Sequence, residues 1–182
     1  LNFHRTYYHP SNSYIYLYGN MDMEEKLAFL DEHYLSHFDY LDVDSVIQEQ
    51  KAFGACRDVT LEYPVAENEG EEDNTYLSYN MVVGNAADSQ MAMAFEVLDY
   101  ALLSAPGAPL KQALLDVKAG KDVYGSYDDG ILQPYFTVIA KGSNPDRKEE
   151  FVSVIRQVLG DIVKNGIDRK AVEAGINYFE FR

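Results

Sequence analysis

Alternating apolar and polar positions predict a β-hairpin in the last third of the chain. Residues 123–127 and 131–141 are rich in β-branched and aromatic side chains, and the turn sequence Asp128-Asp129-Gly130 separates them. The more apolar face of the second run is expected to pack against helices; it carries Leu132, Pro134, Phe136, Val138 and Ala140. Because Pro134 has no backbone N–H, it indicates an edge strand or a bulge.

Helical periodicity both follows and precedes this hairpin. Asn144 and Pro145 form a helix start, and an apolar stripe then recurs at spacings of three and four up to Gly166: Phe151, Ile155, Val158 and Ile162. Asp168 is expected to begin a last helix. Residues 89–103 predict an earlier helix, and a second short helix ends at Lys118; the buried face of the earlier helix carries Met91, Phe95, Leu98 and Leu102.

The first half of the chain has weaker patterns. Residues 14–18 form a compact apolar run typical of a central strand. Asp22 with Glu25 is a capping box that begins a helix carrying Leu27, Leu30, Tyr34 and Phe38. Residues 57–63 and 75–84 alternate and are expected to pair as a hairpin. The acidic run between them, residues 67–73, either binds a cation or a basic peptide or is a solvated loop.

From residue 57 onward, the predicted order is two strands, two helices, two strands and two helices. This repeated β-β-α-α unit predicts an α+β fold, in which an antiparallel-rich mixed sheet has helices packed on one face. We expect a single domain over residues 1–182, to which residues 1–38 add a strand and a helix.

Composition narrows the choice of partners. The net charge of the 182 residues is −15, which argues against nucleic acid and anionic membranes because both require a basic surface. A single cysteine, Cys56, excludes an internal disulfide and a zinc site built from several cysteines. No apolar run reaches the roughly 20 residues of a membrane-spanning helix.

Few residues carry recognisable chemistry. His33 and His37 have a spacing that can bind zinc on a helix, but no glutamate lies between them to act as a base, which favours two surface histidines. The sequence contains neither a Gly-x-Ser-x-Gly motif nor a phosphate-binding glycine loop. No nucleophile, base and orienting group come together, so the pattern indicates a catalytically silent module.

Distinctive segments occur along nearly the whole chain: Tyr8-His9-Pro10-Ser11-Asn12, Tyr18-Gly19-Asn20, Pro106-Gly107-Ala108-Pro109-Leu110, Asp122-Val123-Tyr124-Gly125-Ser126-Tyr127, Gln133-Pro134-Tyr135-Phe136 and Glu173-Ala174-Gly175-Ile176-Asn177-Tyr178. In this order, they resemble the presequence-protease branch of the pitrilysin/insulinase zinc metallopeptidases. The resemblance implies a metallopeptidase-like α/β sandwich domain within a longer chain of four such domains.

In that family the catalytic zinc lies in the first domain, on an inverted His-x-x-Glu-His helix. This sequence has no such motif, so the resemblance implies the second, non-catalytic domain, with no catalytic or metal-binding residue and no cofactor. The implied parent is a zinc metalloendopeptidase that degrades unstructured peptides such as targeting presequences, in a bacterial cytoplasm or an organelle matrix. Its partners would be the neighbouring domains and peptide substrates, and residues 1–8, Phe179 and Phe181 would be partly exposed in the isolated piece.

The resemblance also implies a substrate-binding edge. Related insulin-degrading enzymes hold the end of a substrate by strand addition at a sheet edge beside a glycine loop; the matching positions here are Gly107, Val123, Tyr124, Gly125, Ser126 and Tyr127. Such an edge would present free backbone groups, and Gly125 would leave room beside the main chain. The alternative is an interior strand in which Gly125 accommodates a bend. Two further functions remain open: a non-enzymatic scaffold or inactive subunit of the same superfamily, and a metal-binding protein that uses His33 and His37.

Overall fold

The computed structural model describes residues 1–68 and 70–181, and these form two compact units, Leu1–Gln48 and Glu49–Arg182. Glu69, inside the predicted acidic loop, lies outside the described residues. The single domain expected over residues 1–182 stays a prediction.

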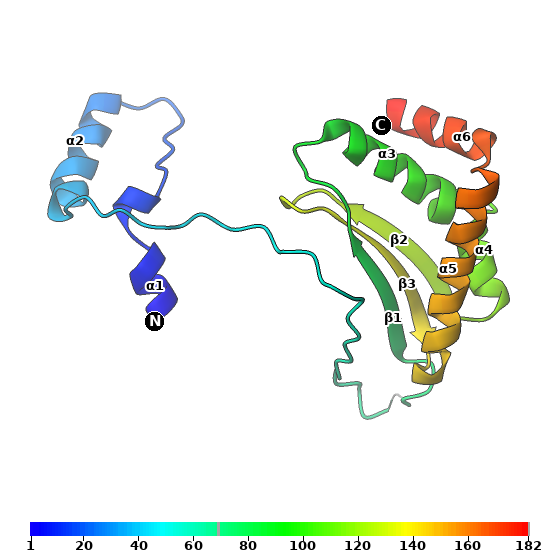
Figure 1. Cartoon of the computed structure of the whole chain (residues 1–182). Coiled ribbons are helices and arrows are strands. Elements are labelled where there is room, and N and C mark those ends of the chain that lie inside the picture. The colour runs from blue at the N-terminus through cyan, green and yellow to red at the C-terminus, as the bar shows by residue number, and fades with distance from the viewer. Residues whose placement is uncertain (69, 182) are drawn as a thin grey trace. The chain divides into compact units, whose positions relative to one another are not determined.

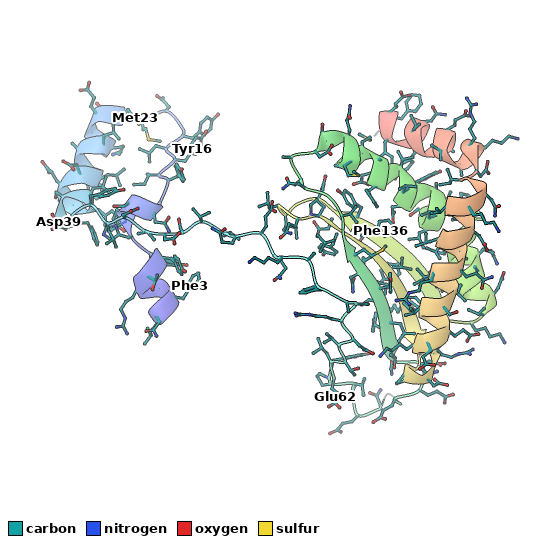
Figure 2. All side chains as sticks on the ribbon, in the orientation of Figure 1. Phe3, Tyr16, Met23, Asp39, Glu62 and Phe136 are labelled. Atoms are coloured by element: carbon teal, nitrogen blue, oxygen red, sulfur yellow. The ribbon has the colours of Figure 1, made fainter. Side chains whose placement is uncertain are left out.

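The first unit contains two short α-helices, α1 (Asn2–Tyr7) and α2 (Met23–His33), and two 3-10 turns, η1 (Pro10–Asn12) and η2 (Leu35–His37). The predicted cap of α2 is confirmed, because Asp22 Oδ1 accepts a hydrogen bond of 3.0 Å from the Glu25 N–H. Neither α-helix buries a residue, and the side chains labelled on this unit in Figure 2 are all exposed. Phe3 is 69% exposed, which agrees with the exposure expected for residues 1–8.

Two predictions for this unit are wrong. Residues 14–18 form no strand, and Tyr14 and Tyr16 are fully or largely exposed, because no described strand of the unit offers them backbone partners. Helix α2 ends at His33, before Tyr34 and Phe38. Leu27, expected on the apolar face of this helix, is 56% exposed, so its side chain supplies little packing to stabilise a longer helix.

The second unit is built on a three-stranded antiparallel sheet, consisting of β1 (Thr75–Val82), β2 (Asp122–Asp128) and β3 (Tyr135–Ser143), with the order β1-β3-β2. The predicted pairing of the hairpin strands is confirmed, since β2 pairs with β3 in a register that places Tyr124 opposite Ile139. The connection is longer than the expected three-residue turn, because β3 begins only at Tyr135. Leu132, which was expected on the packed face of the strand, lies in this connection and is 50% exposed. Strand β3 also pairs with β1 and is therefore central, while β1 and β2 form the two edges of the described sheet.

The predicted hairpin between residues 57–63 and 75–84 is absent, because residues 57–63 form no strand. Within this segment, Val59 and Leu61 are exposed. Asp58 forms an ion pair with Lys148, at the start of a helix, and the Tyr63 hydroxyl donates to the carbonyl oxygen of Asn74. Both contacts lie near the start of β1, so they hold the segment at one end of that strand and not along it.

The helices of this unit cover one face of the sheet, as predicted (Figure 1). They are α3 (Ser89–Asp99), the π-helical segment η3 (Tyr100–Ser104), α4 (Pro109–Asp116), the 3-10 turn η4 (Pro145–Arg147), α5 (Lys148–Asn165) and α6 (Arg169–Glu180). The α+β class and the helix-covered sheet are thus confirmed, although only one strand, β1, precedes the first pair of helices.

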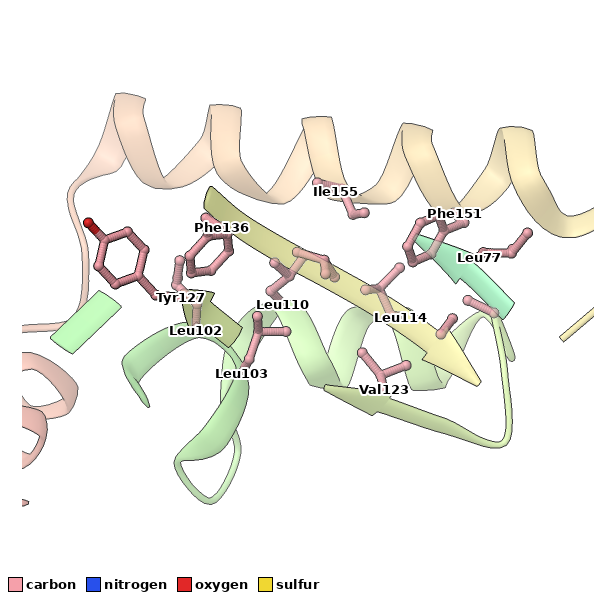
Figure 3. Close-up of a cluster of buried hydrophobic side chains, with 13 residues drawn as sticks. Leu77, Leu102, Leu103, Leu110, Leu114, Val123, Tyr127, Phe136, Phe151 and Ile155 are labelled. Atoms are coloured by element: carbon pink, nitrogen blue, oxygen red, sulfur yellow. The ribbon is translucent and has the colours of Figure 1, made fainter. Parts of the chain in front are cut away.

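Between the helices and the sheet lies one cluster of buried apolar side chains (Figure 3). The helical stripe and the apolar face of β3 predicted from the sequence meet in it, and its members include Leu103, Leu110, Leu114, Val123, Phe136, Val138, Ala140, Phe151 and Ile155. Packing of such side chains is the main source of stability in a unit of this size.

The ends of the helices follow the predicted signals with one exception. Asp168 Oδ1 accepts a hydrogen bond of 2.9 Å from the Lys170 N–H, and Gly166 ends α5 with a φ of 87°. The exception is Asn144, whose side chain does not cap η4. It donates to Asp73 Oδ1 at 2.8 Å and accepts from the Asp73 N–H at 2.9 Å.

Asp73, the last residue of the acidic run, is therefore part of the fold. Lys121 Nζ lies 3.2 Å from Asp73 Oδ2. The hydrogen bond from Asn144 and the bond and charge of Lys121 lower the pKa of the Asp73 carboxyl. Asp73 therefore fits neither a cation site nor a wholly solvated loop, because its carboxylate is bound by Lys121, just before β2, and by Asn144, just before η4.

The packing of the core predicts that alanine substitutions at two apolar positions will differ in their effect on the free energy of unfolding. Leu110 is fully buried, so Leu110→Ala should lower the free energy of unfolding by about 2–5 kcal/mol through lost burial and a cavity. Val163, on α5, is 87% exposed, and Val163→Ala should change it by at most about 0.5 kcal/mol. Urea unfolding of the two variants measures the difference, and equal losses would contradict this packing.

Candidate functional site

Strand β2 is hydrogen-bonded to β3 alone, so one side of its backbone faces away from the described sheet. The Val83 N–H donates to the Pro134 carbonyl oxygen at 2.8 Å, which continues the β1–β3 register. Along an antiparallel strand, the N–H and C=O groups of successive residues point alternately to the two sides. Pro134 points to β1, so Thr137, three residues later in β3, points to β2, where it pairs with Ser126. The backbone groups of Gly125 then point to the open edge.

The same alternation directs the backbone groups of Val123 and Tyr127 to this edge. The Val123 N–H is already used, because it donates to Asp122 Oδ1 at 2.8 Å. The open edge thus offers the N–H groups of Gly125 and Tyr127 together with three carbonyl oxygens. The structure places β2 at an edge of the described sheet, and the alternative of an interior strand does not fit that sheet.

Gly125 has a different role from the one expected. A Cβ atom at this position would overlap Leu103 Cδ1 and would lie 2.8 Å from the Thr137 carbonyl oxygen and 2.9 Å from Asp99 Oδ1. The expectation of free room beside Gly125 is therefore wrong on the helix-covered face, because η3 and α3 fill that space. The glycine lets the helices approach β2 closely.

The two tyrosines of β2 lie on opposite faces. Tyr124 is 38% exposed on the helix-free face and can contact a ligand, as can the exposed Ser126. Tyr127 is 9% exposed and stacks on Phe95 with ring centroids 5.4 Å apart. Burial raises the pKa of the Tyr127 hydroxyl, and nearby carboxylates add to this effect. The expected contact area therefore comes from Tyr124 and Ser126, because the Tyr127 side chain belongs to the core.

Gly107 lies outside the strand, in the loop between η3 and α4, with a φ of 74°. It lines a shallow hollow of about 270 Å³ whose other lining residues include Ser104, Ala108 and Lys111. Lys111 Nζ also lies 3.5 Å from Asp122 Oδ1, at the first residue of β2. Lys111 thus connects the hollow around Gly107 with the start of β2.

Asp99, at the end of α3, was not singled out by the sequence patterns. Its Oδ2 accepts a hydrogen bond of 3.2 Å from Ser104 Oγ, and its Oδ1 is buried without a hydrogen-bond partner among the described residues. Burial raises the pKa of the Asp99 carboxyl, and the Ser104 hydrogen bond opposes this rise. A signal was present, since Asp99 follows the buried-face residue Phe95 by four positions and so shares its helical face.

The residues present do not fit a zinc site. Among residues 1–68 and 70–181, no group of three or more histidine, cysteine, aspartate or glutamate side chains could hold a metal ion. His33 ends α2 and His37 lies in η2, so the two do not share one continuous helix, and the His33 ring packs on Phe29 with centroids 4.6 Å apart. None of the described helices is long and apolar enough to cross a membrane.

Comparisons with known proteins agree with this architecture. The sequence profile of the peptidase M16 inactive domain matches residues 1–179. Protein HypA of Clostridium perfringens is 45% identical over the whole chain, and presequence protease 1 of Arabidopsis thaliana, chloroplastic/mitochondrial, is 32% identical over 98% of it. The chain spans 19% and 17% of these two proteins, respectively.

A solved inactive peptidase domain from Bordetella parapertussis shares the fold. It aligns with a TM-score of 0.51 and 13% identity over 58% of this chain and 57% of that chain. Since the family profile covers nearly all of the sequence, the chain belongs to the peptidase M16 family, as an inactive domain related to those of presequence proteases.

Proposed function

We propose that the chain is the second, non-catalytic domain of a zinc metalloendopeptidase that degrades unstructured peptides such as targeting presequences. In this proposal, the domain holds an extended substrate by adding it as a strand to the open edge of β2. One observation carries the proposal: β2 has a single partner in the described sheet, and its outer side offers main-chain donors and acceptors.

The chemistry of an unstructured peptide fits such an edge. Strand addition recognises backbone groups, which every peptide has, so it suits an enzyme that must hold many sequences. Side-chain contact would come from Tyr124 and Ser126 on the helix-free face, and the hollow around Gly107 would receive an end of the peptide near the start of β2. The net charge of −15 favours basic peptides within a Debye length of about 8–10 Å.

Strand β1 is the other edge of the described sheet, and it is less suited to a long peptide. The Tyr63 hydroxyl donates to the carbonyl oxygen of Asn74 just before β1, and the Tyr63 ring packs edge-on against Tyr76 with centroids 6.0 Å apart. The chain itself therefore occupies the approach to the start of β1. Strand β2 has no second strand partner in the described sheet.

The zinc of the parent enzyme would be held by another domain. This chain spans only 17% and 18% of two similar proteins named presequence proteases, which leaves room for such a domain. Their organellar names and the bacterial source of protein HypA support a bacterial cytoplasm or an organelle matrix as the compartment. The neighbouring domains of the same polypeptide would then be the domain's other partners.

The first prediction concerns chemistry. The purified chain should fold, should lose zinc on gel filtration, and should not cleave an unstructured peptide, because a catalytic zinc needs three protein ligands that the described residues do not bring together. Elemental analysis measures the retained zinc, and mass spectrometry of an incubated peptide measures cleavage. Stoichiometric zinc with chelator-sensitive cleavage would contradict the proposal.

The second prediction concerns the edge and leaves the protein unchanged. Gly125→Pro is unsuitable, because the crowding around Gly125 would unfold β2. Instead, an unstructured ten-residue peptide should bind the chain, and N-methylation of alternate residues should have two different effects. Methyl groups on the set whose N–H groups face β2 should weaken binding about tenfold or more, and methyl groups on the other set should have little effect.

Fluorescence anisotropy measures the affinity of the chain for the parent peptide and for each of the two methylated peptides. Equal losses for both sets would mean that side chains and not the backbone are recognised. Absence of any binding would contradict the substrate-holding role and would favour a non-enzymatic scaffold.

A further inference from the structure

The carboxylate of Asp99 lies directly over the one glycine of β2. Its Oδ1 atom would be 2.9 Å from a Cβ atom on Gly125, on the helix-covered face of the strand. None of the described ion pairs includes Asp99, and its Oδ1 has no hydrogen-bond partner among the described residues. A buried carboxylate oxygen without a partner is costly in a folded protein, which points to a role other than stability.

The geometry of strand addition brings a ligand side chain to this carboxylate. The outward backbone groups of Gly125 would pair with one peptide residue, and directly opposite residues of an antiparallel pair have their Cβ atoms about 4.5–5.5 Å apart on the same face. The side chain of that peptide residue would therefore start within about 8 Å of Asp99 Oδ1. Long side chains bridge this span, and short ones do not.

We propose that Asp99 selects a basic side chain, arginine or lysine, at the peptide position opposite Gly125. This inference rests on the proposed function, because it requires a peptide on the edge of β2. Asp99 is only partly buried as a residue. A rotation of its carboxylate that breaks the 3.2 Å hydrogen bond between Oδ2 and Ser104 would present one oxygen to an incoming cation. A guanidinium would supply the donors that Oδ1 lacks, in the paired geometry that carboxylates favour.

The test uses two peptides and three forms of the chain. The peptides are unstructured, nine residues long and identical except at the central position, which is arginine in one and its neutral isostere citrulline in the other. The forms are the wild type, Asp99→Asn, and the matched control Asp146→Asn, which removes the same charge from an exposed position at the start of η4. Dissociation constants are measured by fluorescence anisotropy, and thermal unfolding verifies that each form is folded.

The wild type and Asp146→Asn should bind the arginine peptide about tenfold to a hundredfold more tightly than the citrulline peptide. Asp99→Asn should abolish this preference and leave the affinity for the citrulline peptide unchanged. The comparison of the two peptides on the wild type needs no variant, so equal binding there overturns the inference even if Asp99→Asn fails to fold. In that case Asp99→Ser, which also removes the charge, takes the place of Asp99→Asn.

Three outcomes would overturn the inference. If both peptides bind the wild type equally, the edge stands but Asp99 does not select a charge. If arginine is preferred equally by Asp99→Asn, the general negative charge of the chain is responsible and not this carboxylate. If neither peptide binds, the proposed function fails and the inference fails with it.

Discussion

The close packing of η3 against β2 is the contact on which the second unit depends. Leu103 is almost fully buried and occupies the space where any side chain at position 125 would have to lie. With a larger residue there, the helices could not approach the sheet, and the cluster that joins Leu103 and Leu110 to Val123 and Val138 would open. Because this packing uses only the helix-covered face of β2, it leaves the outer backbone of the strand available.

One strand thus has two separate roles. Its helix-facing side chains, Val123 and Tyr127, are anchored in the core, which fixes the backbone in an extended conformation. Its free N–H and C=O groups are therefore already in place for pairing. When a peptide binds, nearly all of the conformational entropy that is lost is that of the peptide. The proposed recognition by Asp99 fits the same arrangement, since α3 and η3 hold this carboxylate beside the strand.

The sequence predicts the second unit well where local signals and burial agree. The apolar face of β3 from Phe136 to Ala140 and the stripe from Phe151 to Ile162 appear as expected, because these positions meet partners in the core. The three-residue turn does not, because β3 begins at Tyr135 and not at Ile131. The family resemblance identified β2 as the candidate site, which periodicity alone could not do.

The predictions that are wrong share one physical cause, which is dependence on partners that are distant in the sequence. Residues 14–18 and 57–63 have strand-like patterns, but neither finds a neighbouring strand among the described residues. Asn144 was expected to cap a helix, but its amide binds Asp73, a residue 71 positions away in the sequence. The position of Asp99 over Gly125 likewise depends on how α3 crosses β2, which local sequence does not specify.

Amide hydrogen exchange measured by nuclear magnetic resonance tests the central claim, that β2 receives peptides along its open edge. With a saturating unstructured peptide, exchange at the Gly125 and Tyr127 amides should slow strongly, since these N–H groups face the edge. The Ser126 amide, which faces β3, and the Ser78 amide on the outer side of β1 should change little. Slowed exchange at Ser78 with no change at Gly125 and Tyr127 would contradict the account.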